Sequence, residues 1–120
     1  MTLQEFYAAT GGGYEDALGR LHSERLVQKF VLKFLNDDSY SLLCRSLEEQ
    51  NMEEAFRAAH TLKGVCMNLG FERLLHSSSM LTESLRNGVG ENMTELFQQV
   101  QQDYEQIIAA LQQFKKTQEL

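Results

Sequence analysis

The sequence predicts an all-α fold, an antiparallel four-helix bundle with short N-terminal helical segments that cap one end. Apolar residues recur every three to four positions, which is typical of helices with one buried face. No stretch alternates with period two over a useful length, so strands are not expected. The chain contains no proline, which allows long uninterrupted helices. The connections between helices are short, and short connections favour antiparallel neighbours.

Composition narrows the class of protein. The 120 residues suffice for one compact domain, so residues 1–120 are expected to form a single helical domain. The net charge of −6 argues against nucleic acid or an anionic membrane as the main partner. No apolar run approaches the roughly 20 residues that span a bilayer, and no signal peptide is visible. We therefore expect a cytoplasmic protein with two free thiols, Cys44 and Cys66.

Two short helices are expected before residue 23. Residues 2–9 place Leu3, Phe6 and Tyr7 on one side, and residues 14–21 add a second short turn or helix. Three consecutive glycines at 11–13 should interrupt the chain between them and make a flexible joint.

The stronger helical pattern begins at Ser23, a candidate N-cap. Residues 36–39 interrupt it, and a shorter helix should continue to about residue 50. The apolar positions of these two segments are expected to face inward. They are Leu26, Val27, Phe30, Val31, Phe34 and Leu35, followed by Tyr40, Leu43, Cys44 and Leu47.

Three longer helices should follow. Asn51 and Glu54 have the spacing of a capping box, and Gly70 is suited to end the helix that they begin. Residues 72–87 form the next helix, and residues 88–90 the turn after it. Asn92 and Glu95 repeat the capping arrangement before a final helix of about six turns.

His60 lies in the middle of the predicted helix 51–69. An α-helix advances roughly 100° per residue, which puts His60, Lys63, Gly64 and Met67 opposite the apolar stripe. The imidazole should therefore face solvent. A glycine inside a helix costs about 1 kcal/mol relative to alanine, so its missing side chain is expected to serve a purpose. The apolar stripe comprises Ala55, Ala58, Ala59, Leu62, Val65, Cys66 and Leu69.

The neighbours of His60 favour phosphoryl chemistry over metal binding. A solvent-facing neutral imidazole can act as a nucleophile, a base or a metal ligand. Lys63, one turn away, would repel a metal ion, would hydrogen-bond a phosphoryl group and would keep the imidazole neutral. Gly64 leaves backbone bare, so that a partner's active site can approach the ring. A metal site with His60, His76 and Cys66 would require Cys66 to leave the core.

Phe56 and Met67 are apolar residues predicted near the His60 side, and Arg57 flanks it. Exposed apolar residues around a reactive group suggest a docking patch for a partner. The alternative is that they pack against a neighbouring segment, such as the N-terminal helix.

The motif His60-Thr61-Leu62-Lys63-Gly64, followed by Asn68-Leu69-Gly70, resembles the signature of histidine-containing phosphotransfer (HPt) domains of bacterial phosphorelays. Residues 14–21, the helix around residues 30–34 and residues 81–88 extend the likeness to about 14–115. The resemblance implies a four-helix bundle with a phosphorylatable histidine exposed in mid-helix. It implies that His60 accepts the phosphoryl group, Lys63 neutralises it and Gly64 provides clearance. Arg86 falls where some members place a basic or polar residue near the histidine.

The family also implies partners. The histidine would receive its phosphoryl group from an aspartyl phosphate on a response-regulator receiver domain, supplied by a hybrid sensor histidine kinase, and pass it to another receiver. No cofactor is expected on this chain, since magnesium would belong to the receiver. The protein would be a monomer and an intermediary without independent catalytic turnover.

The chain departs from the family pattern at two positions. Val65 stands where many members have serine, and Thr82 where glutamate or glutamine is common. Two other hypotheses remain beside the relay. One is a helical adaptor that binds receiver domains without phosphotransfer, and the other is a small metal-binding or hydrolytic bundle that uses His60.

Overall fold

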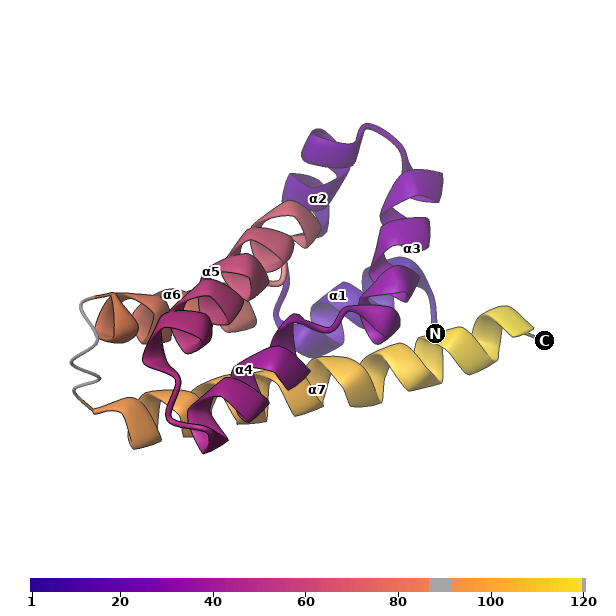
Figure 1. Cartoon of the computed structure of the whole chain (residues 1–120). Coiled ribbons are helices and arrows are strands. Elements are labelled where there is room, and N and C mark those ends of the chain that lie inside the picture. Colours follow the sequence, from indigo (N-terminus) through magenta and orange to yellow (C-terminus); the bar gives the residue numbers. More distant parts are fainter. Residues whose placement is uncertain (87–91, 120) are drawn as a thin grey trace.

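The computed structural model describes residues 1–86 and 92–119, and every regular element in these ranges is helical (Figure 1). The predicted turn at residues 88–90 lies outside the described residues. The helices are α1 (Leu3–Thr10), α2 (Tyr14–Leu21), α3 (Glu24–Lys33), α4 (Ser39–Glu48), α5 (Met52–Leu69), α6 (Glu72–Leu85) and α7 (Met93–Glu119), with a 3₁₀ turn at Phe34–Asn36.

Helices α4 to α7 form the predicted antiparallel bundle. The connection from α4 to α5 and the one from α5 to α6 each take only a few residues, which makes these neighbours antiparallel. The bundle core is apolar, with Leu43, Leu62, Leu81 and Leu111 fully buried. Tyr40 of α4 stacks on Tyr104 of α7 at a centroid distance of 3.8 Å, which joins the first and last helices of the bundle.

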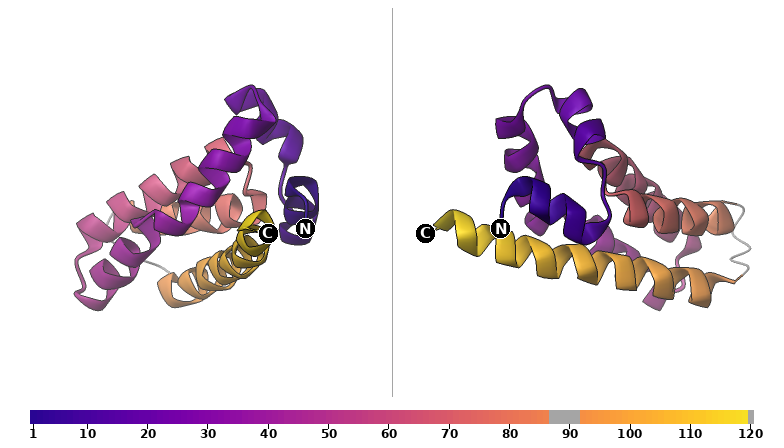
Figure 2. Two further views of the ribbon diagram at one scale, coloured as in Figure 1. Left: turned by 90° about the vertical axis from the view of Figure 1, so that its right-hand side faces the viewer. Right: turned by 180° about the vertical axis from the view of Figure 1, so that it is seen from behind.

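The N-terminal helices cover one end of the bundle, as the sequence predicts. Helix α1 lies along the second half of α7 (Figure 2), and the Met1 amino group donates to Thr117 Oγ1 at 3.2 Å. Phe6 of α1 is fully buried and contacts Phe71 and Phe114. The Tyr7 hydroxyl donates to the Leu69 carbonyl oxygen at 2.6 Å, which satisfies a carbonyl at the end of α5.

Helix α3 differs from the prediction. Only Val27 and Val31 within it are buried, whereas Leu26 and Phe30 are exposed. Helices α2 and α3 rise away from the long axis of the bundle (Figure 1), so one narrow stripe of α3 reaches the core. A helical wheel shows only which side of a helix is apolar. It does not show how much of that side a neighbouring helix covers, so the narrow contact of α3 could not be predicted from it.

The glycines at 11–13 form a tight junction instead of a loose joint. Gly13 N donates to the Gly70 carbonyl oxygen at 2.8 Å, and Gly11 and Gly70 both have positive φ, at 66° and 69°. A Cβ atom on Gly70 would collide with the Gly13 carbonyl oxygen. The junction fixes the end of α5 against the start of α2 and depends on the absence of side chains.

Gly70→Ala should therefore destabilise the fold. A left-handed conformation costs a residue with a Cβ roughly 1–2 kcal/mol, and the collision with backbone adds to that cost. We expect the free energy of unfolding, measured by urea denaturation, to fall by about 2 kcal/mol or more. Wild-type stability in the Gly70→Ala protein would contradict the close junction.

Candidate functional site

Helix α5 places the candidate residues. The Asn51 side chain caps it by accepting from Glu54 N at 3.2 Å, and Gly70 ends it in a left-handed conformation. The predicted capping box is only half formed, because the Glu54 carboxylate binds Arg57 and the Asn51 backbone N–H donates to the Ser46 carbonyl oxygen. Both ends of α5 are nevertheless fixed, and with them the direction in which each of its side chains projects.

His60 is exposed in the middle of α5, as the helical periodicity predicts. The opposite face of α5 is buried and supplies the bundle core. Its buried residues are Ala55, Ala58, Ala59, Leu62, Cys66 and Leu69. Val65, predicted at the edge of this stripe, is half-buried. The imidazole therefore projects from the outer side of a helix whose back is anchored in the core.

Phe56 supports the His60 ring. The two rings lie nearly parallel, with centroids 6.0 Å apart and planes inclined by 17°. The Arg86 guanidinium carbon, at the end of the neighbouring α6, lies 5.3 Å from the centroid of the Phe56 ring. Phe56 is half-buried and packs against the core. The structure thus places Phe56, a residue of the predicted docking patch, and Arg86, which the resemblance places near the histidine, in one layered arrangement beside His60.

Glu83 completes this arrangement, although no sequence pattern had pointed to it. Arg86 Nη2 donates to Glu83 Oε1 at 2.8 Å, and Arg86 Nε donates to Oε2 at 3.1 Å. These hydrogen bonds lower the pKa of Glu83, and its electrostatic interactions with Arg86, Lys63 and His60 lower it further. The carboxylate therefore lies within the field of His60 and Lys63. The sequence signal that could have identified Glu83 is its position three residues before Arg86 on the same helix, a spacing at which oppositely charged side chains can pair.

Lys63 and Gly64 differ in what surrounds them. Lys63 is half-buried, and among residues 1–86 and 92–119 no carboxylate lies within 4.0 Å of its ammonium group. Gly64 is exposed, and among the described residues a Cβ built on it would meet no atom within 4 Å apart from the backbone of its own helix. Internal packing therefore gives no reason for a glycine at this position.

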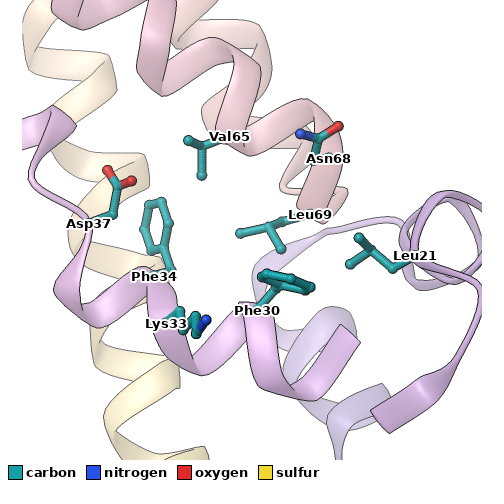
Figure 3. Close-up of a pocket in the computed structure, with 8 residues that line it drawn as sticks. All are labelled: Leu21, Phe30, Lys33, Phe34, Asp37, Val65, Asn68 and Leu69. Carbon is teal, nitrogen blue, oxygen red and sulfur yellow. The ribbon is translucent and has the colours of Figure 1, made fainter. Parts of the chain in front are cut away.

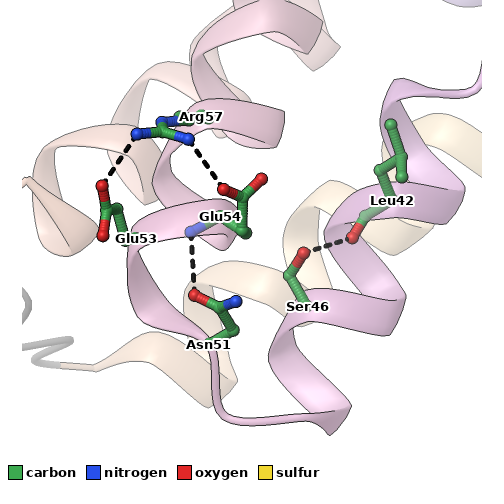
Figure 4. A network of polar contacts seen from close by, with 6 residues as sticks. All are labelled: Leu42, Ser46, Asn51, Glu53, Glu54 and Arg57. Carbon is green, nitrogen blue, oxygen red and sulfur yellow. Dashed lines mark hydrogen bonds and ion pairs between the residues drawn. The ribbon is translucent and has the colours of Figure 1, made fainter.

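Arg57 and Met67 occupy separate parts of the same helix. Arg57 donates to Glu53 Oε1 at 2.8 Å and to Glu54 Oε1 at 2.7 Å, so it is held in ion pairs near the start of α5 (Figure 4). Met67 is 38% exposed, two turns beyond His60. Of the two apolar residues predicted near His60, Phe56 packs partly against the core, whereas Met67 stays exposed.

Thr82 and Cys66 are turned away from the site. Thr82 is fully buried and its hydroxyl donates to the Ser78 carbonyl oxygen at 2.6 Å. Cys66 is buried in the core as a free thiol, and burial raises its pKa. In the part of the chain that the structure describes, no group of three or more His, Cys, Asp or Glu residues is arranged to hold a metal ion. No helix there is long and apolar enough to cross a membrane.

An exposed histidine, a nearby cation and a bare stretch of backbone on an all-α bundle define a site suited to a helical phosphoryl carrier. The chain belongs to the Hpt domain family, because the family model for the Hpt domain matches residues 31–110. The matched region lies within the expected 14–115. Comparisons with curated proteins and with solved structures gave no significant match.

Membership in the family sets the general role. Hpt domains act in phosphorelays by histidine phosphotransfer, where they interact with receiver domains and kinases. They are phosphoryl carriers and not classical enzymes.

Proposed function

We propose that this protein is a phosphorelay intermediary whose His60 accepts a phosphoryl group from an aspartyl phosphate on one receiver domain and passes it to another. The observation that carries the proposal is the exposed imidazole of His60, with the Lys63 ammonium and the open backbone of Gly64 on the same helix. Because the site has no internal use in the described fold, an outside partner best accounts for it.

The transfer needs one nucleophile from this chain. A ring nitrogen of neutral His60 donates its lone pair to phosphorus as the bond to the partner's carboxylate oxygen breaks, and the carboxylate leaves with the electron pair. Attacking and leaving atoms must lie roughly in line. The mid-helix position of His60 and the missing side chain at Gly64 leave room for that approach. Magnesium, if required, would come with the receiver, since the Lys63 charge disfavours a cation here.

Two cations would hold the new negative charge. Lys63 is one candidate, because it follows His60 by three residues on the same helix and no carboxylate of the described residues lies within 4.0 Å of its ammonium group. Arg86 is held by Glu83 in the unphosphorylated protein, and both side chains are largely exposed. An exposed pair of this kind contributes little, so a phosphoryl group can compete with Glu83 for the guanidinium. Phe56, Arg57, Met67 and Arg86 would contribute to the surface that meets the partner.

The direct test is phosphoryl transfer from a panel of purified receiver domains that have first been phosphorylated on aspartate. The intact protein should take up label that is stable in base and labile in acid, as a phosphoramidate is. The label should then move to a second receiver. Receivers that bind the protein but never exchange phosphate would instead support an adaptor.

Lys63→Ala should keep the fold and weaken the phosphorylated state. Lys63 is only half-buried, so the free energy of unfolding should change by about 0.5 kcal/mol or less. Loss of one charge-assisted contact should cost about 1.5 kcal/mol or more, equivalent to a roughly tenfold slower transfer or shorter phosphohistidine lifetime.

Lys63→Arg serves as the matched variant, since it keeps the charge and should recover much of the effect. Wild-type transfer and lifetime in the Lys63→Ala protein would remove Lys63 from the mechanism.

A further inference from the structure

Helix α3 exposes two large apolar side chains that the fold does not use. Leu26 is 39% exposed and Phe30 is 38% exposed. They are four residues apart and therefore form a short stripe on one side of the helix. Most of α3 precedes residue 31, where the match to the family model begins, so family membership does not account for this stripe.

A row of cations runs beside the apolar stripe. Arg25, Lys29 and Lys33 are exposed and are also spaced by four residues. The Nζ atoms of Lys29 and Lys33 lie 6.0 and 5.3 Å from the centroid of the Phe30 ring. Within the described ranges no carboxylate lies within 4.0 Å of any of the three.

The charge of this row is the opposite of the charge of the whole protein. The chain carries a net charge of −6, whereas α3 contains three basic residues and only one acidic residue, Glu24. Like charges at this spacing destabilise a helix. The mutual repulsion of the three cations therefore lowers the stability of the helix, and an acidic partner would relieve that repulsion. We call Arg25, Leu26, Lys29, Phe30 and Lys33 together the α3 face.

The α3 face borders an apolar recess between α3 and α5. The recess has a volume of about 360 Å³. Figure 3 shows Phe30 and Phe34 on the α3 side and Val65 and Leu69 on the α5 side, with Lys33 at the edge. Its remaining lining residues are Leu21, Asp37 and Asn68. A recess of this kind accepts an apolar side chain of a partner, and the cations beside it would meet carboxylates around that side chain.

The recess opens beside the proposed phosphoryl site, on a neighbouring side of α5. Val65 lies roughly 7.5 Å beyond His60 along the helix axis but about 140° around it, whereas the exposed Asn68, which also lines the recess, lies about 80° around the helix from His60. A protein as large as a receiver domain that approaches His60 over the bare backbone of Gly64 and extends past Asn68 would reach the recess and the α3 face beyond it. The departure from the family pattern at Val65 supplies part of the apolar wall.

We propose that the α3 face is a charge-selective docking surface, which selects receiver domains that carry an acidic surface around an exposed apolar side chain. This inference rests on the proposed function. The cations would steer the acidic partner and reject basic ones, while Phe30 and the recess would hold its apolar side chain. The α3 face thus acts on encounter and selection, whereas the His60 site acts on transfer.

The test compares two double charge reversals. Lys29→Glu/Lys33→Glu removes the cations of the α3 face, and Lys115→Glu/Lys116→Glu makes the same change of net charge at the exposed end of α7. The probe is the phosphorylated receiver domain that transfers fastest to the wild-type protein. At low salt the α3 variant should lower kcat/KM by about tenfold, with less effect at high salt, and leave the saturating rate unchanged. The α7 variant should retain most of the wild-type kcat/KM.

Phe30→Ala tests the apolar part, and it should also raise KM without changing the saturating rate. Labelling of His60 by a small phosphoramidate, in which the bond from phosphorus to ammonia breaks as the bond to the imidazole forms, needs no docking. All these variants should accept that label at the wild-type rate.

Equal kcat/KM for the two charge-reversal proteins would overturn the proposal. So would an α3 variant that loses binding to anionic lipid vesicles while its receiver kinetics stay at wild type. Failure of His60 itself to accept any label would instead remove the proposed function, so the two failures are distinguishable.

Discussion

A His60→Gln protein should fold as the wild type does and accept no phosphoryl group. The side chain is exposed and its main contact is the stacking on Phe56, so the free energy of unfolding should change by about 0.5 kcal/mol or less. Glutamine keeps a polar side chain of similar reach but offers no nucleophilic nitrogen lone pair. Label transferred from a phosphorylated receiver should fall to background, measured after separation of the two proteins.

The other two histidines provide matched controls. His22 and His76 are both exposed, and neither contacts the stack of His60, Phe56 and Arg86. His22→Gln and His76→Gln should therefore keep wild-type labelling. Acid-labile label on the His60→Gln protein would show that another residue is the acceptor, and loss of label in the His76→Gln protein would point to α6.

The position of His60 could be predicted because it depends on local geometry alone. Helical periodicity fixes which side of α5 is buried, and the buried side contains six residues that the wheel also places there. The exposure of Gly64 follows from the same periodicity. A helix with a clear apolar stripe thus reveals its outer face without any knowledge of its neighbours.

Features that depend on contacts between helices could not be predicted. The contact of Arg86 with Phe56 joins α5 and α6 and depends on the register of the two helices, which no spacing within one helix determines, so only the family resemblance placed Arg86 near His60. The position of Glu83 near His60 depends on the same register between α5 and α6. The exposure of Phe30 depends on the angle at which α3 leaves the bundle. Gly13 and Gly70 are far apart in sequence, so the hydrogen bond between them could not be predicted from local spacing either.

Gly64→Ala should raise stability and impair transfer. Alanine is better than glycine inside a helix by about 0.5–1 kcal/mol, and in the described part of the chain no atom outside the backbone of α5 lies within 4 Å of the added methyl group. Urea denaturation should show the gain. The same methyl group stands where the partner's active site must approach His60, and a misplacement of about 1 Å can slow a reaction roughly 100-fold. We therefore expect transfer from a receiver to slow by about 10- to 100-fold.

Gly19 supplies the control, because it is also exposed in a helix with no atom within 4 Å of an added Cβ. Gly19→Ala should raise the free energy of unfolding by a similar amount and leave transfer unchanged, since it lies on α2. A bulkier Gly64→Gln should slow transfer further than Gly64→Ala does, while labelling by a small phosphoramidate changes little in either protein. Opposite signs for stability and transfer at residue 64 alone would identify clearance for a partner as the reason for its glycine. A Gly64→Ala protein that is more stable and transfers at the wild-type rate would leave that glycine without a role in docking.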